Sequence, residues 1–489
     1  MTSLHTLRAE ESLDPDDWDG LRVLGHRMVD DMLTYLRTVR DRPVWRPIPA
    51  DVRARFRGPV PHDPQGAERA YADFRDYVLP HPMGNIHPRF WGWVMGTGTP
   101  LGALADMLAA GMNPNMGGGD HVANHVEAQV LDWCKEMLGF PADASGLLVS
   151  GGSMANLVGL AVARSARAGF DIRKRGVRGA TGPLTVYGSV EMHSSIQKGV
   201  ELLGLGSDAL RQVPVNAEFE IDVAALERMV TEDRTAGCRP ICVIGNAGTV
   251  GTGAIDDLRR LAAVAARERL WFHVDGAFGA LAVLVPEFRP RLGGMEVADS
   301  IAFDLHKWMY VPFEAGCTLV RDADAHRRAF ALRPDYLTHA ERGLAAGNLW
   351  FSDYGIQLTR GFRALKVWMS LKEHGLDKYA RLVRQNIDQA RYLAELIREA
   401  PDLELLAPVP LNIVCFRYVA QRRDDAALDA LNQELLIQLH EQGIAVPSNL
   451  TLGGRFALRV AITNQRSRRE DFDLLVSEVR RIGAALASA

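Results

Sequence analysis

Between residues 147 and 320, short apolar runs alternate with stretches whose apolar residues recur at helical spacing. The runs lie at 147–149, 185–187, 241–245, 271–274, 300–303 and 317–320. The stretches between them, such as 154–168 and 256–269, have the period of amphipathic helices. Strands that alternate with helices favour a mainly parallel sheet between two layers of helices. This region predicts the α/β core of the protein.

The pattern changes on both sides of this core. Residues 17–38 form an amphipathic helical pattern behind an acidic start, which suits a helix N-terminus. That helix is too short to bury its apolar face alone, so we expect it to pack on the main body or on a second subunit. Beyond about 360, helical patterns and apolar runs predict a smaller α+β lobe. Its helices are expected at 363–374, 378–398 and 469–486, and its strands at 411–417 and 456–462.

Composition narrows the class of protein. The chain has 489 residues, of which 47% are hydrophobic and 24% charged, as in ordinary globular proteins. The net charge of −4 gives no general attraction to nucleic acid. No apolar stretch reaches the roughly 18–20 residues that span a bilayer. The N-terminus lacks the pattern of a signal peptide, and five scattered cysteines suggest reduced thiols, so we expect a cytoplasmic protein without membrane partners.

Two of the predicted strands end in groups that carry chemistry. The run at 271–274 is followed by Asp275, and the run at 300–303 leads to His306-Lys307-Trp308, with Lys307 lying 32 residues after Asp275. Each group alone is more often a helix cap or a solvated charge. Together, an acid and an amine at strand ends are what pyridoxal phosphate needs. The lysine binds the cofactor aldehyde, and the aspartate holds a proton on the ring nitrogen.

Three further segments are open to two interpretations each. Ser150-Gly-Gly-Ser153, between a strand and a helix, is either a phosphate-binding turn or an ordinary turn with a cap. Asn246, after another strand, either completes a phosphate cup or belongs to a tight turn. His193 is either a buried core residue or a ring that stacks on the cofactor and touches the substrate carboxylate.

Two pairs of residues also need an interpretation. His121 and His125 have i, i+4 spacing, but no third metal ligand is near, so a structural or pocket-lining role is favoured over a metal site. Trp91 and Trp93 alternate beside Phe90 and either belong to the core or form the wall of an aromatic substrate pocket.

These motifs, in this order, resemble the group II pyridoxal-phosphate-dependent amino acid decarboxylases, which include aromatic-L-amino-acid, histidine and glutamate decarboxylases. The resemblance extends from about residue 15 to the end. The most specific motif is His-Lys-Trp after His-Val-Asp. The motifs that carry the resemblance are His87-Pro-Arg-Phe90, Ser150-Gly-Gly-Ser153, His193-Ser-Ser195, His273-Val-Asp275-Gly-Ala277, His306-Lys307-Trp308 and Asp335-Tyr336-Leu337.

The resemblance implies a role for each motif. Lys307 would bind the cofactor, Asp275 would pair with its ring nitrogen, and His193 and Ala277 would pack on opposite faces of the ring. Gly152, Ser153, Asn246 and His306 would surround the phosphate. Tyr336, on a loop at about 329–350 that closes over the site, would return a proton to the substrate α-carbon after CO2 leaves. Asp304 departs from the family, whose aromatic-amino-acid members often have asparagine there. Because an acid beside a phosphate is unfavourable unless it turns away or pairs, Asp304 is left out of the phosphate set.

The resemblance also implies the fold and the reaction. The fold would be of the aspartate aminotransferase type (fold type I), with a mainly parallel seven-stranded sheet and a smaller C-terminal α+β lobe. We expect a helical segment at 1–84 that packs on the partner subunit of a homodimer, a cofactor domain at 85–360 and a small domain at 361–489. The expected reaction is decarboxylation of an L-amino acid, most simply an aromatic one, given the tryptophans.

Three other reactions compete with this expectation. An aldehyde synthase would couple decarboxylation to oxidative deamination, but that outcome tends to accompany loss of the loop tyrosine, and Tyr336 is present. An acidic-amino-acid decarboxylase would need a basic group, for which Arg89 is the candidate. An aminotransferase is disfavoured by Tyr336 and the His193 motif.

Overall fold

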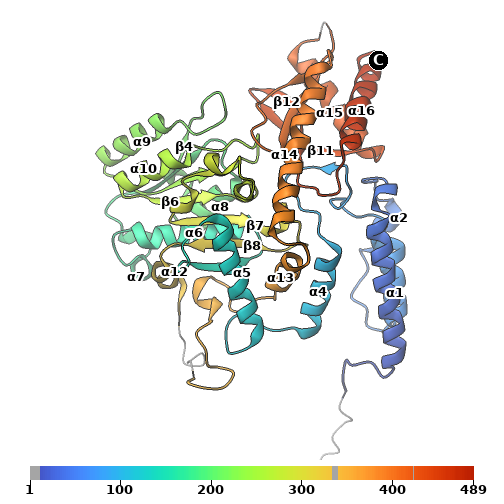
Figure 1. The fold of residues 1–489 in the computed structure, drawn as a ribbon, viewed down its shortest axis with the longest axis horizontal. Coiled ribbons are helices and arrows are strands. Elements are labelled where there is room, and N and C mark those ends of the chain that lie inside the picture. The colour runs from blue at the N-terminus through green and yellow to red at the C-terminus, as the bar shows by residue number, and fades with distance from the viewer. Residues whose placement is uncertain (1–10, 333–339, 422, 489) are drawn as a thin grey trace, which may run out of the picture.

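A seven-stranded sheet forms the centre of the computed structural model, which describes residues 11–332, 340–421 and 423–488 (Figure 1). All neighbouring strands are parallel except at β8, which runs antiparallel to both of its neighbours. This is the mainly parallel sheet that the sequence predicts. In spatial order the strands are β2 (Ser145–Val149), β8 (Gly316–Val320), β7 (Ser300–Asp304), β6 (Trp271–Asp275), β5 (Arg239–Asn246), β3 (Leu184–Ser189) and β4 (Leu210–Val213).

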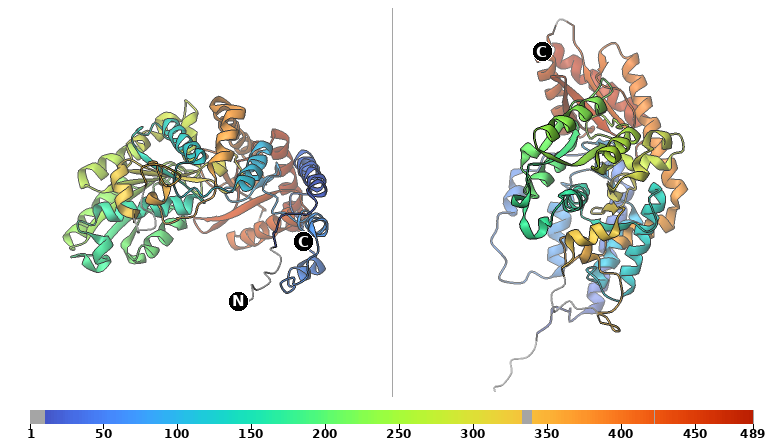
Figure 2. Two further views of the ribbon diagram at one scale, coloured as in Figure 1. Left: turned by 90° about the horizontal axis from the view of Figure 1, so that it is seen from below. Right: turned by 90° about the vertical axis from the view of Figure 1, so that its left-hand side faces the viewer.

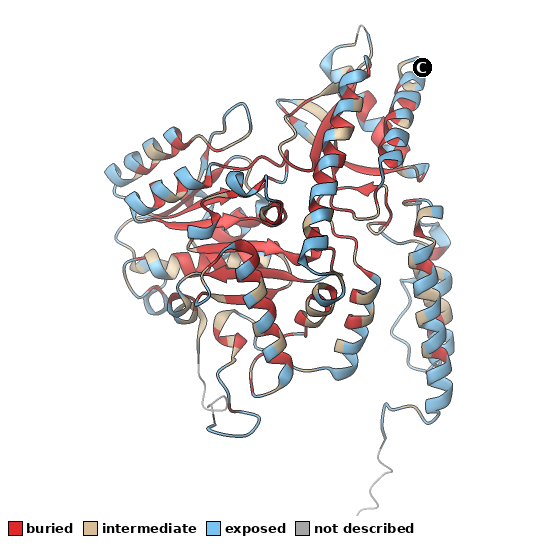
Figure 3. Ribbon diagram, viewed as in Figure 1, coloured by how far each residue is buried: buried red, intermediate tan, exposed pale blue. Residues whose placement is uncertain are grey.

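Helices cover both faces of this sheet and bury its strands (Figure 3). One face packs on α6 (Gly152–Arg167), α8 (Ser194–Leu202) and α12 (Ala323–Phe330). The other packs on α5 (Val122–Leu138), α9 (Val223–Thr235) and α10 (Leu258–Glu268). Strands that are buried on both faces read as continuous apolar runs, which is why the sequence shows them clearly.

A second sheet, of five strands, belongs to the C-terminal lobe. Its strands in spatial order are β1 (Phe90–Trp91), β11 (Val446–Leu452), β12 (Arg455–Ala461), β10 (Ile413–Tyr418) and β9 (Leu403–Leu405). β1 pairs parallel with β11, whereas the other pairs are antiparallel. The segment that the sequence assigns to the start of the cofactor domain therefore contributes a strand to the smaller sheet.

Three long helices accompany this smaller sheet, namely α14 (Leu376–Glu399), α15 (Asp425–Glu441) and α16 (Arg469–Ser488). The remaining helices are α1 (Trp18–Arg37), α2 (Ala50–Arg55), α3 (Ala67–Asp73), α4 (Pro100–Met112), α7 (Ile172–Arg175), α11 (Leu305–Trp308) and α13 (Ala364–His374). Among the helices of the described ranges, none combines the length and apolarity needed to cross a membrane.

Helix α1 lies at the edge of the molecule, away from the large sheet (Figures 1 and 2). Its start is capped by Asp17, which accepts a hydrogen bond from the amide of Gly20 at 2.9 Å. Leu24 and Tyr35 are buried, but Leu21 and Met28 remain 40% and 42% exposed. The helix thus leaves much of its apolar face open within one chain.

Candidate active site

A cavity of about 600 Å³ opens where the carboxyl ends of β5, β6 and β7 meet the turn after β2. Ligands bind at this edge of open α/β sheets, because loops and helix N-termini converge there. The structure brings most of the residues singled out in the sequence into its wall. Those residues are Trp93, Gly152, Ser153, His193, Asn246, Asp275, Ala277, His306 and Lys307.

Strand register accounts for this convergence. Asn246 and Asp275 are cross-strand partners at the ends of β5 and β6. Asp275 in turn pairs with Ala302 of β7, two residues before that strand ends at Asp304. The one-turn helix α11 follows immediately and carries Lys307. Neighbouring parallel strands therefore deliver the aspartate and the lysine to the same cavity.

Asp275 lies at the end of a buried chain of hydrogen bonds. The indole Nε1 of Trp271 can only donate, and it does so to the Ser300 hydroxyl at 2.8 Å. The same hydroxyl lies 2.8 Å from Nδ1 of His273. Nε2 of His273 lies 2.9 Å from Oδ1 of Asn156, an amide oxygen that can only accept, so the neutral ring carries its proton on Nε2 and Nδ1 accepts from the Ser300 hydroxyl.

The same chain continues from Asn156 to the cavity. Its amide nitrogen donates to Oδ2 of Asp275 at 2.9 Å and to the Ser195 hydroxyl at 3.0 Å. Oδ1 of Asp275 accepts from the backbone amide of Ala277 at 3.1 Å. Burial lowers the pKa of His273 to about 3, so the ring stays neutral and its Nε2–H donates to Asn156, whose amide nitrogen in turn donates to Asp275.

His193, the N-cap of α8, also lines the cavity and adjoins this chain through Ser195. Its Nδ1 lies 2.8 Å from the Ser195 hydroxyl and accepts from the Ser195 backbone amide at 3.2 Å. A neutral His193 ring therefore carries its proton on Nε2 and can donate it to an anion in the cavity. Burial lowers the pKa of the imidazole, and the charge of Asp275 partly offsets that effect.

The turn after β2 forms a cup beside Lys307. The amides of Gly152 and Ser153 lie in the first turn of α6, at the positive end of the helix dipole. They have no acceptors within the helix. A Cβ added to Gly152 would lie 2.9 Å from Oδ2 of Asp304 and 3.3 Å from the Ala277 methyl. Only glycine leaves this cup open, so the residues fit a bound phosphate.

Asp304 lies at the edge of the cup and is paired. Its Oδ2 lies 2.8 Å from Nζ of Lys307 and 3.8 Å from Nε2 of His306. His306 accepts from the amide of Ala315 through Nδ1, which leaves the proton on Nε2. The departure from the family at Asp304 is therefore balanced by an ion pair. With a phosphate cup, an amine and an acceptor for a ring nitrogen, the residues fit pyridoxal phosphate.

Trp91 does not line the cavity, although a substrate pocket wall was one of the two interpretations of its place in the sequence. Trp91 belongs to β1, is 1% exposed, stacks on Phe472 at 4.9 Å and donates to Ser467 at 3.0 Å, so it is a core residue of the smaller lobe and not a pocket wall. Tyr336 lies outside the described residues. Among the described residues, no group of three or more His, Cys, Asp or Glu side chains is placed to hold a metal ion.

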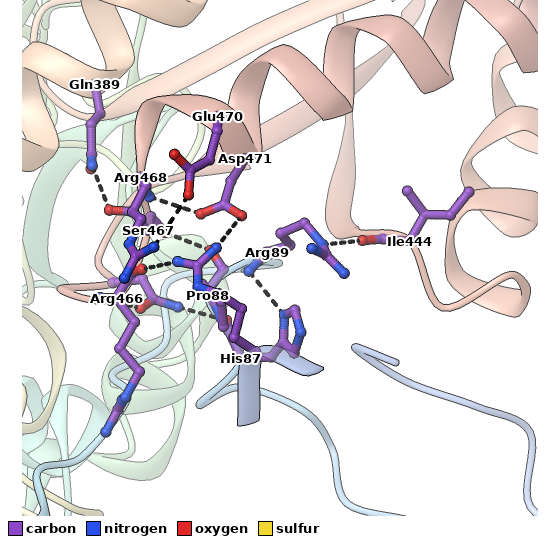
Figure 4. Close-up of polar contacts among 12 residues, drawn as sticks. His87, Pro88, Arg89, Gln389, Ile444, Arg466, Ser467, Arg468, Glu470 and Asp471 are labelled. Carbon is purple, nitrogen blue, oxygen red and sulfur yellow. Dashed lines mark hydrogen bonds and ion pairs between the residues drawn. The ribbon is translucent and has the colours of Figure 1, made fainter. Parts of the chain in front are cut away.

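Arg89 also lies away from the cavity. Its Nε donates to the carbonyl oxygen of Ile444 at 2.7 Å, and its backbone amide donates to His87 (Figure 4). The arginine therefore joins the segment before β1 to the C-terminal lobe. It does not provide a basic group for an acidic substrate.

Several residues of the site were missed in the sequence. Asn156 lies one turn after Gly152 on α6, and that spacing from the phosphate turn is the signal that could have identified it. Ser300 is a polar residue within an apolar strand run, which is a weaker signal. Val250 and Phe313, which also line the cavity, lie in loops after Asn246 and after α11 and carry no chemical group that would identify them.

Fold and site together define a fold type I pyridoxal-phosphate-dependent enzyme, and comparison with known proteins specifies the family. Residues 49–419 match the model of the pyridoxal-dependent decarboxylase conserved domain. The chain therefore belongs to the pyridoxal-dependent decarboxylase family.

Similarity to characterised relatives covers nearly the whole chain. The chain is 32% identical to an aromatic-L-amino-acid decarboxylase of Bacillus atrophaeus, over 94% of this chain and 95% of that protein. It is 29% identical to a phenylacetaldehyde synthase of Arabidopsis thaliana, over 95% and 97% of the two chains. The crystal structure of Oryza sativa TDC with PLP and tryptamine superimposes with a TM-score of 0.88 at 27% identity, over 97% and 99% of the chains.

We predict that Asp275→Asn keeps the cofactor but loses most of its turnover. An amide cannot hold a proton on the ring nitrogen, and loss of one preorganised charge costs on the order of 10²-fold or more in rate. The measurement is turnover together with the visible absorbance of the bound cofactor.

A matched control is Asp299→Asn, which changes an aspartate that accepts from the Phe272 amide at 2.8 Å, at the opposite end of these strands. Near-normal turnover in Asp275→Asn, or an equal loss in the Asp299 variant, would contradict the role given to Asp275.

Proposed function

We propose that this enzyme converts an aromatic L-amino acid to the corresponding amine and CO2. The observation that carries the substrate class is the composition of the cavity wall. Beyond the cofactor end, its side chains are apolar or aromatic apart from Glu314, and the apolar ones include Trp93, Val94, Met95, Val250 and Phe313. Among the described residues of this wall, Lys307 has the one ammonium group and no guanidinium is present.

The proposed roles follow from the chemistry of the reaction. Bound pyridoxal phosphate supplies an aldehyde for the substrate amine and a ring that accepts the electron pair left when CO2 departs. Lys307 holds the cofactor, and Asp275 keeps a proton at its ring nitrogen. Gly152, Ser153, Asn246 and His306 hold the phosphate.

Residues on the substrate side orient the bond that breaks and complete the reaction. His193 packs on the cofactor and donates from Nε2 to the substrate carboxylate, while Ala277 packs on the opposite face. Tyr336 returns a proton from its hydroxyl to the α-carbon, which gives the amine. Closure of its loop would keep water away from that carbon while it carries negative charge.

The competing reactions have less support. An acidic substrate would need a cation at the far end of the cavity, and Arg89 is engaged elsewhere. The acid on that wall, Glu314, is itself paired with Arg363 at 2.9 Å. Aldehyde formation is the second candidate, because one relative is a phenylacetaldehyde synthase. The presence of Tyr336 favours the amine.

We also propose that the enzyme works as a cytoplasmic homodimer in which residues 1–84 pack on the partner subunit. Support comes from the partly exposed apolar face of α1 and from Met112 at the end of α4, whose side chain is 60% exposed. Clusters of exposed apolar side chains on a chain of this size favour an interface. The five cysteines are unpaired, which fits a reducing compartment.

We predict a particle of twice the 53.8 kDa chain mass by light scattering at micromolar concentration. Leu21→Glu combined with Met28→Glu should shift it toward the monomer, since both changes place charge on the exposed face of α1. Exposed Arg22 on the same helix offers the control Arg22→Glu. A fully active wild-type monomer would rule out the dimer.

We predict that Tyr336→Phe diverts the product from amine toward aldehyde. Phenylalanine keeps the aromatic ring but lacks the proton donor, so oxygen would have time to react before the α-carbon is protonated. Under air the variant should form less amine and more aldehyde, ammonia and peroxide than the wild type. The same comparison under nitrogen is the control, because aldehyde formation needs oxygen. An unchanged yield and rate of amine, with no aldehyde, would show that another group supplies the proton.

A further inference from the structure

Trp93 forms one wall of the cavity in an unusual backbone conformation. Its φ is +51°, in the left-handed region that residues other than glycine seldom adopt. The residue is 54% exposed and lines the cavity. Such a conformation is strained and persists only where neighbouring groups impose it. The neighbours that impose it come from the smaller sheet.

Two residues of that sheet hold the Trp93 backbone from both sides. The Trp93 amide donates to the Ser448 hydroxyl at 3.1 Å, and Nη1 of Arg459 donates to the Trp93 carbonyl oxygen at 2.8 Å. Ser448 and Arg459 are cross-strand partners on β11 and β12, and Nη1 also lies 3.2 Å from the Ser448 hydroxyl. A single cross-strand pair therefore fixes both peptide groups of Trp93.

The same guanidinium reaches a second wall of the cavity. Its Nε donates to the carbonyl oxygen of Gly251 at 3.0 Å, and its Nη2 donates to the carbonyl oxygen of Val250. Val250 lines the cavity, as Trp93 does. Only a planar fork with several fixed donors can join two backbone segments through three carbonyl groups in this way, and a lysine ammonium cannot reproduce it.

This guanidinium is held by neutral oxygens. Arg459 is 3% exposed, and its hydrogen bonds go to three carbonyl groups and one hydroxyl. Burial lowers the pKa of Arg459 to about 10, so the side chain is charged at neutral pH. A buried guanidinium that has only carbonyl and hydroxyl partners is costly to keep. Packing of the smaller lobe alone does not require the Arg459 side chain to reach the cavity wall.

We propose that Arg459, assisted by Ser448, is a positioning residue that sets substrate selectivity by fixing Trp93 and Val250 as the walls that contact the substrate side chain. This proposal rests on the proposed function. Without the clamp, Trp93 relaxes toward an ordinary backbone conformation and its indole leaves the wall. Bulky aromatic substrates then lose contact area, whereas small aliphatic substrates lose little. The chemistry at Lys307 and Asp275 is unaffected, because neither residue contacts the clamp.

The test compares Arg459→Lys and Ser448→Ala with a matched control, Arg417→Lys. Arg417 lies on β10 of the same sheet, is 5% exposed and is held by Glu404 at 2.7 Å and Asp425 at 2.8 Å. It does not line the cavity. The control therefore reports any general loosening of the smaller lobe.

The measurements are kcat and KM for tryptophan, phenylalanine and valine, and the visible spectrum of the bound cofactor. In Arg459→Lys we expect KM for the aromatic amino acids to rise about tenfold or more relative to valine, in the range that lost side-chain contacts produce. Ser448→Ala should shift this ratio in the same direction by a smaller factor. The cofactor spectrum and the ratio in Arg417→Lys should match the wild type.

Binding separates this proposal from the proposed function. Titration of the holoenzyme with tryptamine and with isobutylamine, followed by the change in cofactor absorbance, measures selectivity even if wild-type turnover of aromatic amino acids is absent. A loss of preference for tryptamine in Arg459→Lys or Ser448→Ala supports the clamp. An unchanged preference in both, or an equal change in Arg417→Lys, overturns it. If Arg459→Lys does not fold, Ser448→Ala decides alone.

Discussion

The structure depends on the buried hydrogen-bond chain that runs from Trp271 through His273 to Asp275. Asp275 is only 5% exposed, and a carboxylate there would be too costly without donors directed at it. The chain supplies those donors in a single direction, because the Asn156 amide accepts from His273 through its oxygen and donates to Asp275 through its nitrogen. It also crosses from β6 to β7 and α6, so it ties the strand ends to the helix that forms the phosphate cup. The same contacts therefore stabilise the fold and orient Asp275 toward the cavity.

The cavity joins two lobes with different tasks. The seven-stranded sheet supplies the cofactor end, through Asp275, Lys307 and the glycine turn. The five-stranded sheet supplies no residue to that end, but its strands hold Trp93 and the carbonyl of Val250. Under the proposed function, the residues of the reaction and the residues that contact the substrate side chain are therefore held by different sheets.

The parts of the fold visible in the sequence were those encoded locally. The run at 271–274 became β6 (Trp271–Asp275), and the helical stretch at 154–168 became α6 (Gly152–Arg167). Strands buried on both faces leave an unbroken apolar signal, and helices leave their period. β11 gave no such signal, because Pro447, Ser448 and Asn449 interrupt it.

The features that could not be predicted from the sequence depend on contacts between distant segments. Trp91 alternates with Trp93 along the chain, so both suited a pocket wall, but pairing of Phe90 and Trp91 with Val446 and Pro447 draws one indole into the core. Asn156 looks like any polar helix residue until β6 lies beside it. Side chains at the ends of strands could be predicted, whereas the residues that orient them could not.

The central claim is that these strand ends hold pyridoxal phosphate through Lys307. Its most direct test is reduction of the holoenzyme with borohydride, followed by digestion and mass mapping of the pyridoxyl label. We predict that the label lies on Lys307 and that the peptide containing position 307 carries no label in Lys307→Arg. A label on any other lysine of the wild-type enzyme would contradict the assignment of Lys307 as the residue that binds the cofactor.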